Sequence, residues 1–358
     1  MWLLGWIVFY DMVSTLGDNT MRRRLSILLG VFVLGIVAVL AWVSWNKGDD
    51  ILLAGKERIR FQLQWFDQAQ FIGFYVANEK RYYADEGLSV EVQPGGYNVN
   101  PIQRVEMSQA EIGLATADQV LLSKAEGHPL KAIGTVFNKS IACFISRKPL
   151  KIRSPQDLIG KKVGVYLGFD TENVLLSILA KHAVNSRDVN IVPAGMFEAF
   201  VQNEIEVFPS YQINEPFLAA ERGIDVDILM PDMFGVQFYS DTIFTTEKAW
   251  KEKRGSLLRF LKASAKGWAY AESHPDEALD IMFRQIRSSG AKVDARLQKQ
   301  MLLKSIEHLR GGDKNVMFYM DRARWDNMES SLLTIGKLKR QGYVGDLCDF
   351  QMATEASQ

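Results

Sequence analysis

The stretch RIRFQLQWFDQAQFIGFYVANEKRYYADEGLSVEVQ, residues 58–93, decides the fold class of this chain. Its first seven residues alternate between polar and apolar side chains, which predicts a half-buried strand. Residues 69–83 have the pattern of a helix that Glu86-Gly87 ends, and residues 88–93 again have the pattern of a strand. A strand, a helix and a strand in this order predict parallel strands joined by a crossover helix, so we expect an α/β fold.

The same order of elements recurs along the body of the chain. We expect helices at 101–108 and 119–126 on either side of a strand at 112–116. A second unit begins near Cys143, and Ser154-Pro155 has the signature of a short helix start. In that unit the patterns predict strands at 162–166, 189–192 and 206–211, and helices at 171–182, 196–203 and 216–222. After about Gly235 the chain is predicted to be mostly helical, at 247–253, 257–273 and 275–287.

Two return segments, near 141–146 and 230–237, flank the second unit. They predict two lobes joined by paired crossings. We expect lobe 1 to contain 58–141 and 236–350, and lobe 2 to contain 142–235. Ligands in such architectures bind between the lobes, at the carboxyl ends of the strands.

Composition excludes several classes of function. The 42 Lys and Arg residues balance 42 Asp and Glu residues, so no net field draws the protein onto nucleic acid. Cys143 and Cys348 are far apart in the sequence and lack a C-x-x-C partner, and the histidines occur singly. We therefore expect no metal, no cofactor and a monomer that recognises its ligand locally.

The segment before the body predicts membrane attachment. Arg22-Arg23-Arg24 precede an apolar run at 25–45, which approaches the roughly 20 residues needed to cross a bilayer. The basic cluster favours a cytoplasmic side for 1–24, which places the body in the periplasm or outside the cell, on a single-pass helix of the inner (cytoplasmic) membrane. We expect an uncleaved anchor; a cleaved signal is the alternative, with Val39-Leu40-Ala41 a mediocre cleavage site. Met21 would itself make a normal start, so 1–20 has no obvious role.

Aromatic and polar residues cluster just after the predicted strands. Such positions face the gap between lobes in this architecture. The residues that follow the strands or flank the turns after them are Trp65, Asp118, Tyr166, Gly168, Glu172, Tyr211, Asn214 and Glu215, and the return crossing adds Tyr239 and Asp241.

Seven stretches in order resemble one known family. They are Leu63-Gln64-Trp65, residues 73–77, 83–88 and 157–164, Asn214-Glu215-Pro216, and residues 238–247 and 266–271. Together they resemble the SsuA/THI5-like family, which joins bacterial thiamine-pyrimidine solute-binding proteins to fungal pyrimidine synthases. The resemblance covers about residues 58–283.

The resemblance implies a two-lobe periplasmic-binding-protein fold of type II. It also implies capture of a thiamine-precursor pyrimidine, HMP-like or formylaminopyrimidine-like, for an ABC transporter permease. A flat heterocycle is held by aromatic faces and by groups that accept its N–H donors. Trp65, Tyr166, Tyr211 and Tyr239 are the candidate faces, and Glu172, Asn214, Glu215 and Asp241 are the candidate polar partners.

The family also includes enzymes, which the resemblance implies use a pyridoxal-phosphate lysine, a histidine and a cysteine-rich loop. Ala115 and Gln119 stand where the lysine and histidine would fall, and residues 235–241 contain no Cys. Without an amine at 115 no Schiff base forms there. We therefore expect a binding protein and no catalytic residues.

Two other binding functions share this architecture. A sulfonate-binding protein would use helix N-termini, hydroxyls and Arg for its anion, and Glu172, Glu215 and Asp241 argue against that. A sensory ligand-binding module is the second alternative, because residues 238–247 also resemble extracytoplasmic domains of signalling proteins. With one predicted crossing it would have to signal through a partner.

Overall fold

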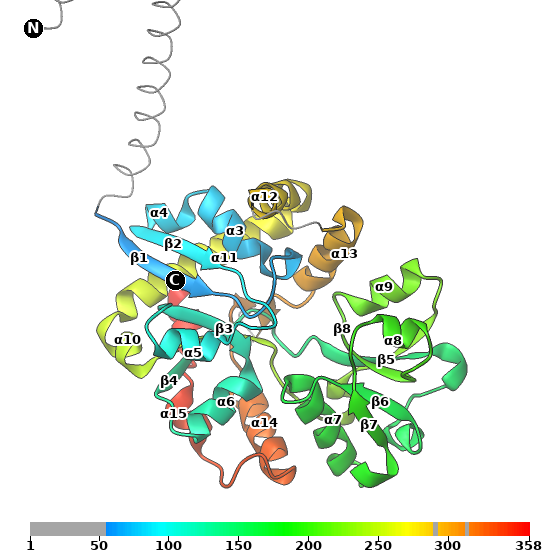
Figure 1. Cartoon of the computed structure of the whole chain (residues 1–358). Coiled ribbons are helices and arrows are strands. Elements are labelled where there is room, and N and C mark those ends of the chain that lie inside the picture. The colour runs from blue at the N-terminus through cyan, green and yellow to red at the C-terminus, as the bar shows by residue number, and fades with distance from the viewer. Residues whose placement is uncertain (1–54, 289–292, 312–314) are drawn as a thin grey trace, which may run out of the picture. The chain divides into compact units, whose positions relative to one another are not determined.

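The computed structural model describes residues 55–288, 293–311 and 315–358 (Figure 1). Residues Glu57–Gln358 form one compact unit. The predicted membrane segment at 25–45 and the residues before it lie outside the described residues. Within the described ranges, no helix combines the length and apolar character needed to cross a bilayer.

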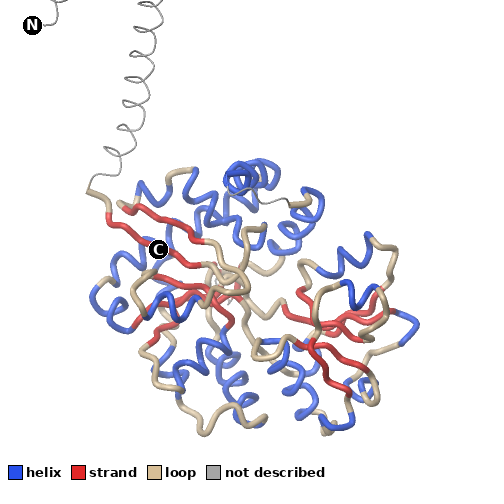
Figure 2. Tube along the Cα trace, in the orientation of Figure 1, coloured by secondary structure: helices blue, strands red, loops and turns tan. Residues whose placement is uncertain are grey.

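The unit contains two five-stranded sheets, which Figure 2 shows as separate groups of strands. The first, sheet A, has the order β2-β1-β3-β10-β4. β1 is parallel to β2 and β3, whereas β10 is antiparallel to β3 and β4. Its strands are β1 (Glu57–Gln62), β2 (Leu88–Gln93), β3 (Ile112–Thr116), β4 (Leu130–Thr135) and β10 (Asp241–Thr246).

The second sheet, sheet B, has the order β7-β6-β8-β5-β9. β6 is parallel to β7 and β8, and β5 is antiparallel to β8 and β9. Its strands are β5 (Ala142–Arg147), β6 (Lys162–Val165), β7 (Asn190–Pro193), β8 (Val207–Tyr211) and β9 (Val226–Leu229). The two sheets thus share one pattern, with an antiparallel strand in the fourth position.

The chain passes between the sheets twice, through residues 136–141 and 235–240. The two crossings are hydrogen-bonded to each other, because Ser140 N donates to Phe238 O at 2.8 Å. Val136 N, at the start of the first crossing, also donates to O of Asp241, the first residue of β10, at 2.7 Å. Each crossing leads into an antiparallel strand of the next sheet, β5 or β10. The crossings therefore form one paired connection.

Helices follow most of the strands, as the alternating pattern predicted. In the part that precedes the first crossing they are η1 (Ala69–Phe71), α3 (Ile72–Glu79), α4 (Tyr82–Asp85), α5 (Pro101–Glu106) and α6 (Ala117–Ala125). Around sheet B they are η2 (Lys148–Leu150), η3 (Pro155–Leu158), α7 (Asp170–Lys181), η4 (Ser186–Asp188), α8 (Glu198–Val201), α9 (Glu215–Glu221) and η5 (Pro231–Phe234).

The C-terminal part packs mainly on sheet A. α11 lies directly against α3, where a Cβ on Gly267 would be 2.1 Å from Gly73 O, so both helices need a glycine at the contact. α14 contacts both α6 and α7 and so touches the helices that follow one strand of each sheet. The elements are α10 (Glu247–Glu252), α11 (Arg254–Ser273), α12 (Pro275–Ser288), α13 (Ala295–Ile306), β11 (Arg310–Gly311), β12 (Val316–Met317), α14 (Arg322–Thr334), α15 (Tyr343–Leu347) and α16 (Met352–Ala356).

The described chain after Gly235 is mostly helical, as expected, but the strand β10 was not predicted. This strand lies between β3 and β4, and its first five residues are buried. Its sequence is neither a continuous apolar run nor a polar–apolar alternation, so neither strand pattern marks it. The expectation of parallel strands is wrong for β5 and β10, which are antiparallel because they enter their sheets directly from the crossings.

The helix predicted at 69–83 is interrupted. η1 and α3 end at Glu79, and α4 starts at Tyr82. Arg81 between them has a φ of 63°, in the left-handed region that a continuous helix cannot include. The periodicity of the apolar residues does not report this single turn.

Candidate functional site

The candidate residues lie where strands of both sheets end. Asp118 is in the first turn of α6, directly after β3, and Tyr211 is the last residue of β8. Asp241 starts β10 and pairs across the sheet with Thr116 at the end of β3. This pairing brings Asp241 next to the segment that holds Asp118, although more than a hundred residues separate them in sequence.

Three buried aspartates form the centre of the site, and we call Asp118, Asp170 and Asp241 the acid cluster. Their exposed fractions are 0%, 3% and 0%. The Tyr211 hydroxyl donates to both carboxylate oxygens of Asp170 at 3.2 Å. Burial raises the pKa of Tyr211, and the charges of Asp170, Asp241 and Asp118 add to the effect. Sheet B thus contributes one phenol that bonds directly to the acid cluster through Asp170.

Each carboxylate has a side-chain amide or hydroxyl partner. Asn173 Nδ2 donates to Asp118 Oδ2 at 2.8 Å. Gln70 Nε2 donates to Asp241 Oδ1 and Oδ2 at 2.9 and 2.8 Å, and Gln64 Nε2 donates to Oδ1. Within the described ranges, none of the ion pairs joins a Lys, Arg or His to the acid cluster. The negative charge of the site is thus stabilised by neutral donors alone.

Burial raises the pKa values of the acid cluster. The pKa of Asp241 is raised to about 7 by desolvation, and that of Asp170 to about 7 by desolvation and by the charge of Asp118. Desolvation also raises the pKa of Asp118. Desolvation favours the neutral form of a carboxyl group, and like charges reinforce the effect. Such a group of carboxylates would gain free energy from a bound cation.

Glu215 and Asn214 support the backbone beside Tyr211. Glu215 Oε2 accepts from Tyr211 N at 2.7 Å and from Ser210 Oγ at 3.2 Å, and its Oε1 accepts from Asn214 Nδ2 at 2.8 Å. Burial raises the pKa of Glu215. In this structure Glu215 fixes the turn from β8 into α9, so it positions Tyr211.

The turn after β6 holds three of the predicted residues. Gly168, at a φ of 77°, donates its backbone N–H to Glu172 Oε2 at 2.7 Å, and Glu172 also pairs with Lys337 at 3.8 Å. Tyr166 N donates to Thr171 Oγ1 at 3.1 Å, and the Tyr166 ring packs edge-on against Phe208. These hydrogen bonds fix the turn between β6 and α7, and α7 carries Asp170 and Asn173.

Aromatic residues that follow β1 and β2 pack together next to Gln64, whose amide donates to Asp241. Trp65 packs edge-to-face against Phe66 and Tyr97 with ring centroids 5.4 and 5.0 Å apart, and Phe66 and Tyr97 are 48% and 77% exposed. Burial raises the pKa of Tyr166, and Glu215 and Tyr97 add to the effect; Tyr166 lies in the turn after β6 of sheet B. These rings form a wall on which a planar ligand could stack.

Tyr239 does not join this group. Its ring is 1% exposed and packs against Trp325 at 6.0 Å, with the Arg324 guanidinium 5.5 Å from the ring centre. Its hydroxyl accepts from Asp321 N at 2.7 Å. The side chain is therefore committed to packing against α14.

Sequence reasoning missed several residues of the site. Asp170 had a usable signal, because it lies in the same strand-to-helix turn as Gly168 and Glu172. Tyr97 lies in the turn-rich loop after β2, and Gln64 directly precedes Trp65. The full set of missed residues is Gln64, Phe66, Gln70, Tyr97, Asp170 and Asn173.

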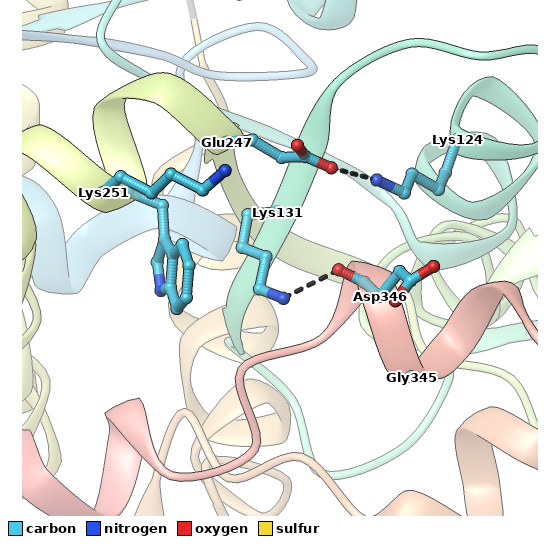
Figure 3. Close-up of a pocket in the computed structure, with 7 residues that line it drawn as sticks. Lys124, Lys131, Glu247, Lys251, Gly345 and Asp346 are labelled. Atoms are coloured by element: carbon cyan, nitrogen blue, oxygen red, sulfur yellow. Dashed lines mark hydrogen bonds and ion pairs between the residues drawn. The ribbon is translucent and has the colours of Figure 1, made fainter.

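A separate cavity of about 350 Å³ lies outside the candidate site (Figure 3). Lys124, Glu247 and Lys131 project toward it, with Lys124 paired to Glu247 and Lys131 Nζ donating to Asp346 O at 2.7 Å. None of the predicted site residues lines it. In the described part of the chain, no group of three or more His, Cys, Asp or Glu residues could hold a metal ion.

Comparison with known proteins assigns the family. The family described as NMT1/THI5 like matches residues 68–278. The chain belongs to this family. Among its relatives, the riboflavin-binding protein RibY of Chloroflexus aurantiacus is 25% identical over 79% of this chain and 82% of that protein. The formylaminopyrimidine-binding protein of Halalkalibacterium halodurans is 24% identical over 78% of this chain and 86% of its own length.

NMT1/THI5-like relatives also include enzymes by name. The 4-amino-5-hydroxymethyl-2-methylpyrimidine phosphate synthase of Legionella pneumophila is 21% identical over 63% of this chain and 73% of its own length. Among solved structures, the periplasmic aliphatic sulphonate-binding protein SsuA of Escherichia coli has a TM-score of 0.62 at 14% identity, covering 84% of this chain and 99% of that one. The likeness shows that this chain has the two-sheet α/β fold of periplasmic binding proteins.

Proposed function

We propose that this protein is an extracytoplasmic solute-binding protein that captures a thiamine-precursor pyrimidine for an ABC transporter. The observation that carries the proposal is the acid cluster, which is buried between strand ends of both sheets and stabilised by neutral donors. Carboxylates in such a place accept N–H donors of a ligand, and a ligand with partial or full positive charge would gain most.

The aromatic wall supports a planar ligand. Trp65 and Phe66 follow Gln64, whose amide donates to Asp241, and both rings pack with Tyr97; Tyr166 lies in the turn after β6 of the other sheet. A small aminopyrimidine, HMP-like or formylaminopyrimidine-like, combines a flat ring with an exocyclic amino group. In this proposal Trp65, Tyr166 and Tyr211 contact the ring, and Asp118 and Asp241 accept its donors, while Asn214, Glu215, Gly168 and Glu172 hold the loops that present them.

A sulfonate ligand is disfavoured by charge. A sulfonate carries a negative charge, and a buried group of three carboxylates would repel it. The likeness to sulphonate-binding proteins concerns the fold, which many ligand classes share.

The synthase alternative is disfavoured by the residue at position 115. Ala115 lies in β3 with 1% exposure and has no amine for a Schiff base with a pyridoxal cofactor. We therefore propose binding without chemistry, with the segment at 25–45 tethering the protein to the outer face of the cytoplasmic membrane.

Titration calorimetry on the full-length protein in detergent tests this function. The ligands are 4-amino-5-hydroxymethyl-2-methylpyrimidine, formylaminopyrimidine, riboflavin, an alkanesulfonate and pyridoxal phosphate. We expect saturable 1:1 binding of at least one aminopyrimidine and at least tenfold weaker binding of the other classes. Preferential binding of riboflavin or of the sulfonate would contradict the proposal.

A further inference from the structure

Two buried oxygen atoms in the site have no donor in full hydrogen-bond geometry, although the Thr116 hydroxyl and the Gln119 amide lie near Asp118. They are Oδ1 of Asp118 and Oδ1 of Asn173, on side chains that are 0% and 3% exposed. A buried acceptor without a donor costs free energy, so native proteins rarely keep one without a reason. These atoms are therefore candidates for contacts that a ligand completes.

The two oxygens belong to helices that follow different sheets. Asp118 lies in α6 after β3 of sheet A, and Asn173 lies in α7 after β6 of sheet B. Their other atoms already meet, since Asn173 Nδ2 donates to Asp118 Oδ2 at 2.8 Å. The pair of open acceptors consequently spans the boundary between the two halves of the site.

The charges around this pair are all negative or neutral. α7 adds Asp170, β8 adds Tyr211 and β10 adds Asp241, each of which influences the others electrostatically. Glu172, also on α7, is engaged by Lys337 and by the Gly168 amide, and Asp241 is engaged by Gln64 and Gln70. A ligand that carries a positive charge would therefore meet no opposing cation among these residues.

We propose that the ligand is an aminopyrimidine bound in its ring-protonated form, with its amino group donating one hydrogen to Asp118 Oδ1 and the other to Asn173 Oδ1. The inference rests on the proposed function and deepens it, because it names the protonation state and the group that is recognised. A primary amino group has the two donors that two open acceptors require. The ring proton places a positive charge beside the acid cluster, where charge-assisted hydrogen bonds are stronger than neutral ones.

The proposal also explains which heterocycles the site would reject. A 4-oxopyrimidine of the same shape presents a carbonyl oxygen where the amino group would lie. That oxygen would face two acceptors, and sites built for a hydrogen-bonding group reject analogues that cannot make the bond. The imide of a flavin, with one N–H between two carbonyls, would be rejected for the same reason.

The first experiment compares two ligands of the same shape. Affinities of 4-amino-5-hydroxymethyl-2-methylpyrimidine and its 4-oxo analogue are measured on the full-length protein and on Asp118→Asn and Asp346→Asn. We expect the amino compound to bind about 100-fold or more tightly than the oxo compound. Asp118→Asn supplies an amide donor, so it should shrink that ratio at least tenfold. Asp346 is exposed and lies in the separate cavity, so Asp346→Asn should leave the ratio unchanged.

The second experiment reads the protonation state directly. The ultraviolet spectrum of a pyrimidine changes when its ring nitrogen is protonated. At pH 8 the free ligand is neutral, and we expect the bound ligand to show the spectrum of its acid form. A neutral-form spectrum for the bound ligand would overturn the protonated form.

The outcomes separate this inference from the proposed function. Equal binding of the amino and oxo compounds, or an unchanged ratio in Asp118→Asn, would overturn the inference and leave pyrimidine binding intact. Failure of both compounds to bind, with binding of riboflavin or a sulfonate, would overturn the proposed function itself.

Discussion

The hydroxyl of Tyr211 lies 3.2 Å from each carboxylate oxygen of Asp170, so one phenol serves both acceptors of a buried acid. Tyr211 ends β8 and Asp170 starts α7, and both residues belong to the half of the site built by sheet B. The bond lowers the pKa of Asp170 against the stronger effects of desolvation and of Asp118. The Tyr211 hydroxyl thus favours the ionised form of Asp170, which burial disfavours.

Tyr211→Phe should weaken binding of a protonated aminopyrimidine by about tenfold. Without the hydroxyl the pKa of Asp170 rises further, so less of the group is ionised at neutral pH, and each pKa unit corresponds to about a tenfold change. Calorimetric affinities at pH 7 check this. Tyr343→Phe, a partly buried tyrosine outside the site, is the control and should bind normally. An unchanged affinity for Tyr211→Phe would exclude the phenol from the binding energy.

Asp170→Asn should flatten the pH dependence of the stability of the ligand-free protein. The pKa of Asp170 is raised from 3.8 to about 7 in the folded state, so the folded protein holds a proton that the unfolded chain releases between these values. The stability due to this group is therefore complete below pH 3.8 and is lost as the pH rises toward 7, by at most about 1.4 kcal/mol per pKa unit. An Asn side chain at position 170 does not ionise, so the variant should not lose this part of its stability as the pH rises.

Denaturant unfolding of ligand-free protein at pH 5 and pH 8 measures the effect. The parent and the exposed Asp346→Asn control should lose more stability over this interval than Asp170→Asn does. Asp241 also has a raised pKa, so the variant should retain part of the slope. The same slope in all three proteins would show that Asp170 is ionised in the folded state throughout.

Trp65→Ala should cost about 1–3 kcal/mol of binding free energy, the usual value for stacking a base on an aromatic side chain. Its ring also supports Phe66 and Tyr97, so the whole aromatic wall should loosen. Trp250→Ala removes a partly buried tryptophan beside the separate cavity and should bind as the parent does. A large drop in the melting temperature of ligand-free Trp65→Ala would instead make Trp65 a packing residue.

Gly267→Ala should destabilise the fold by several kcal/mol. The added Cβ would lie 2.1 Å from Gly73 O and 2.8 Å from Ala77 N, and both are backbone atoms of α3 that cannot rotate away. Gly255→Ala in the same helix α11 meets no atom within 4 Å and is the matched control, with a stability change of at most about 1 kcal/mol. Equal effects of the two substitutions on chemical denaturation would show that α3 and α11 can separate without loss.

The mature protein should retain residues 25–45. The weak cleavage site at Val39-Leu40-Ala41 favours an uncleaved anchor. Intact-mass measurement of protein extracted from membranes decides this. An N-terminus immediately after Ala41 would show that the segment is a cleaved signal.

Local sequence patterns were sufficient for elements with an amphipathic face or a short, mostly apolar run, such as β3. The strands at 88–93 and 112–116 were predicted with the bounds that the structure has, and the helix predicted at 171–182 differs from α7 by one residue at each end. β10 was not predicted, because Asp and Thr occupy four of its six positions, so its sequence is neither a continuous apolar run nor a polar–apolar alternation.

The site could be predicted only in part, because its geometry depends on pairing between distant segments. Asp118 and Asp241 were both selected from their positions after or beside strands, but only the register of β10 against β3 brings them together. Glu215 was selected for its charge, yet its carboxylate is engaged by the Tyr211 amide four residues earlier. A list of strand-end residues therefore does not distinguish side chains that face a ligand from side chains that hold the loops.

Asp241 accepts hydrogen bonds through both its carboxylate and its backbone carbonyl, so a backbone amide of the protein can reveal whether the site is occupied. Its carboxylate belongs to the acid cluster, while its carbonyl oxygen accepts from the Val136 amide at the start of the first crossing. A ligand that binds the carboxylate should therefore also change the stability of this backbone hydrogen bond. Hydrogen–deuterium exchange at the Val136 amide should therefore register occupancy of the site, although Val136 itself contributes nothing to ligand recognition.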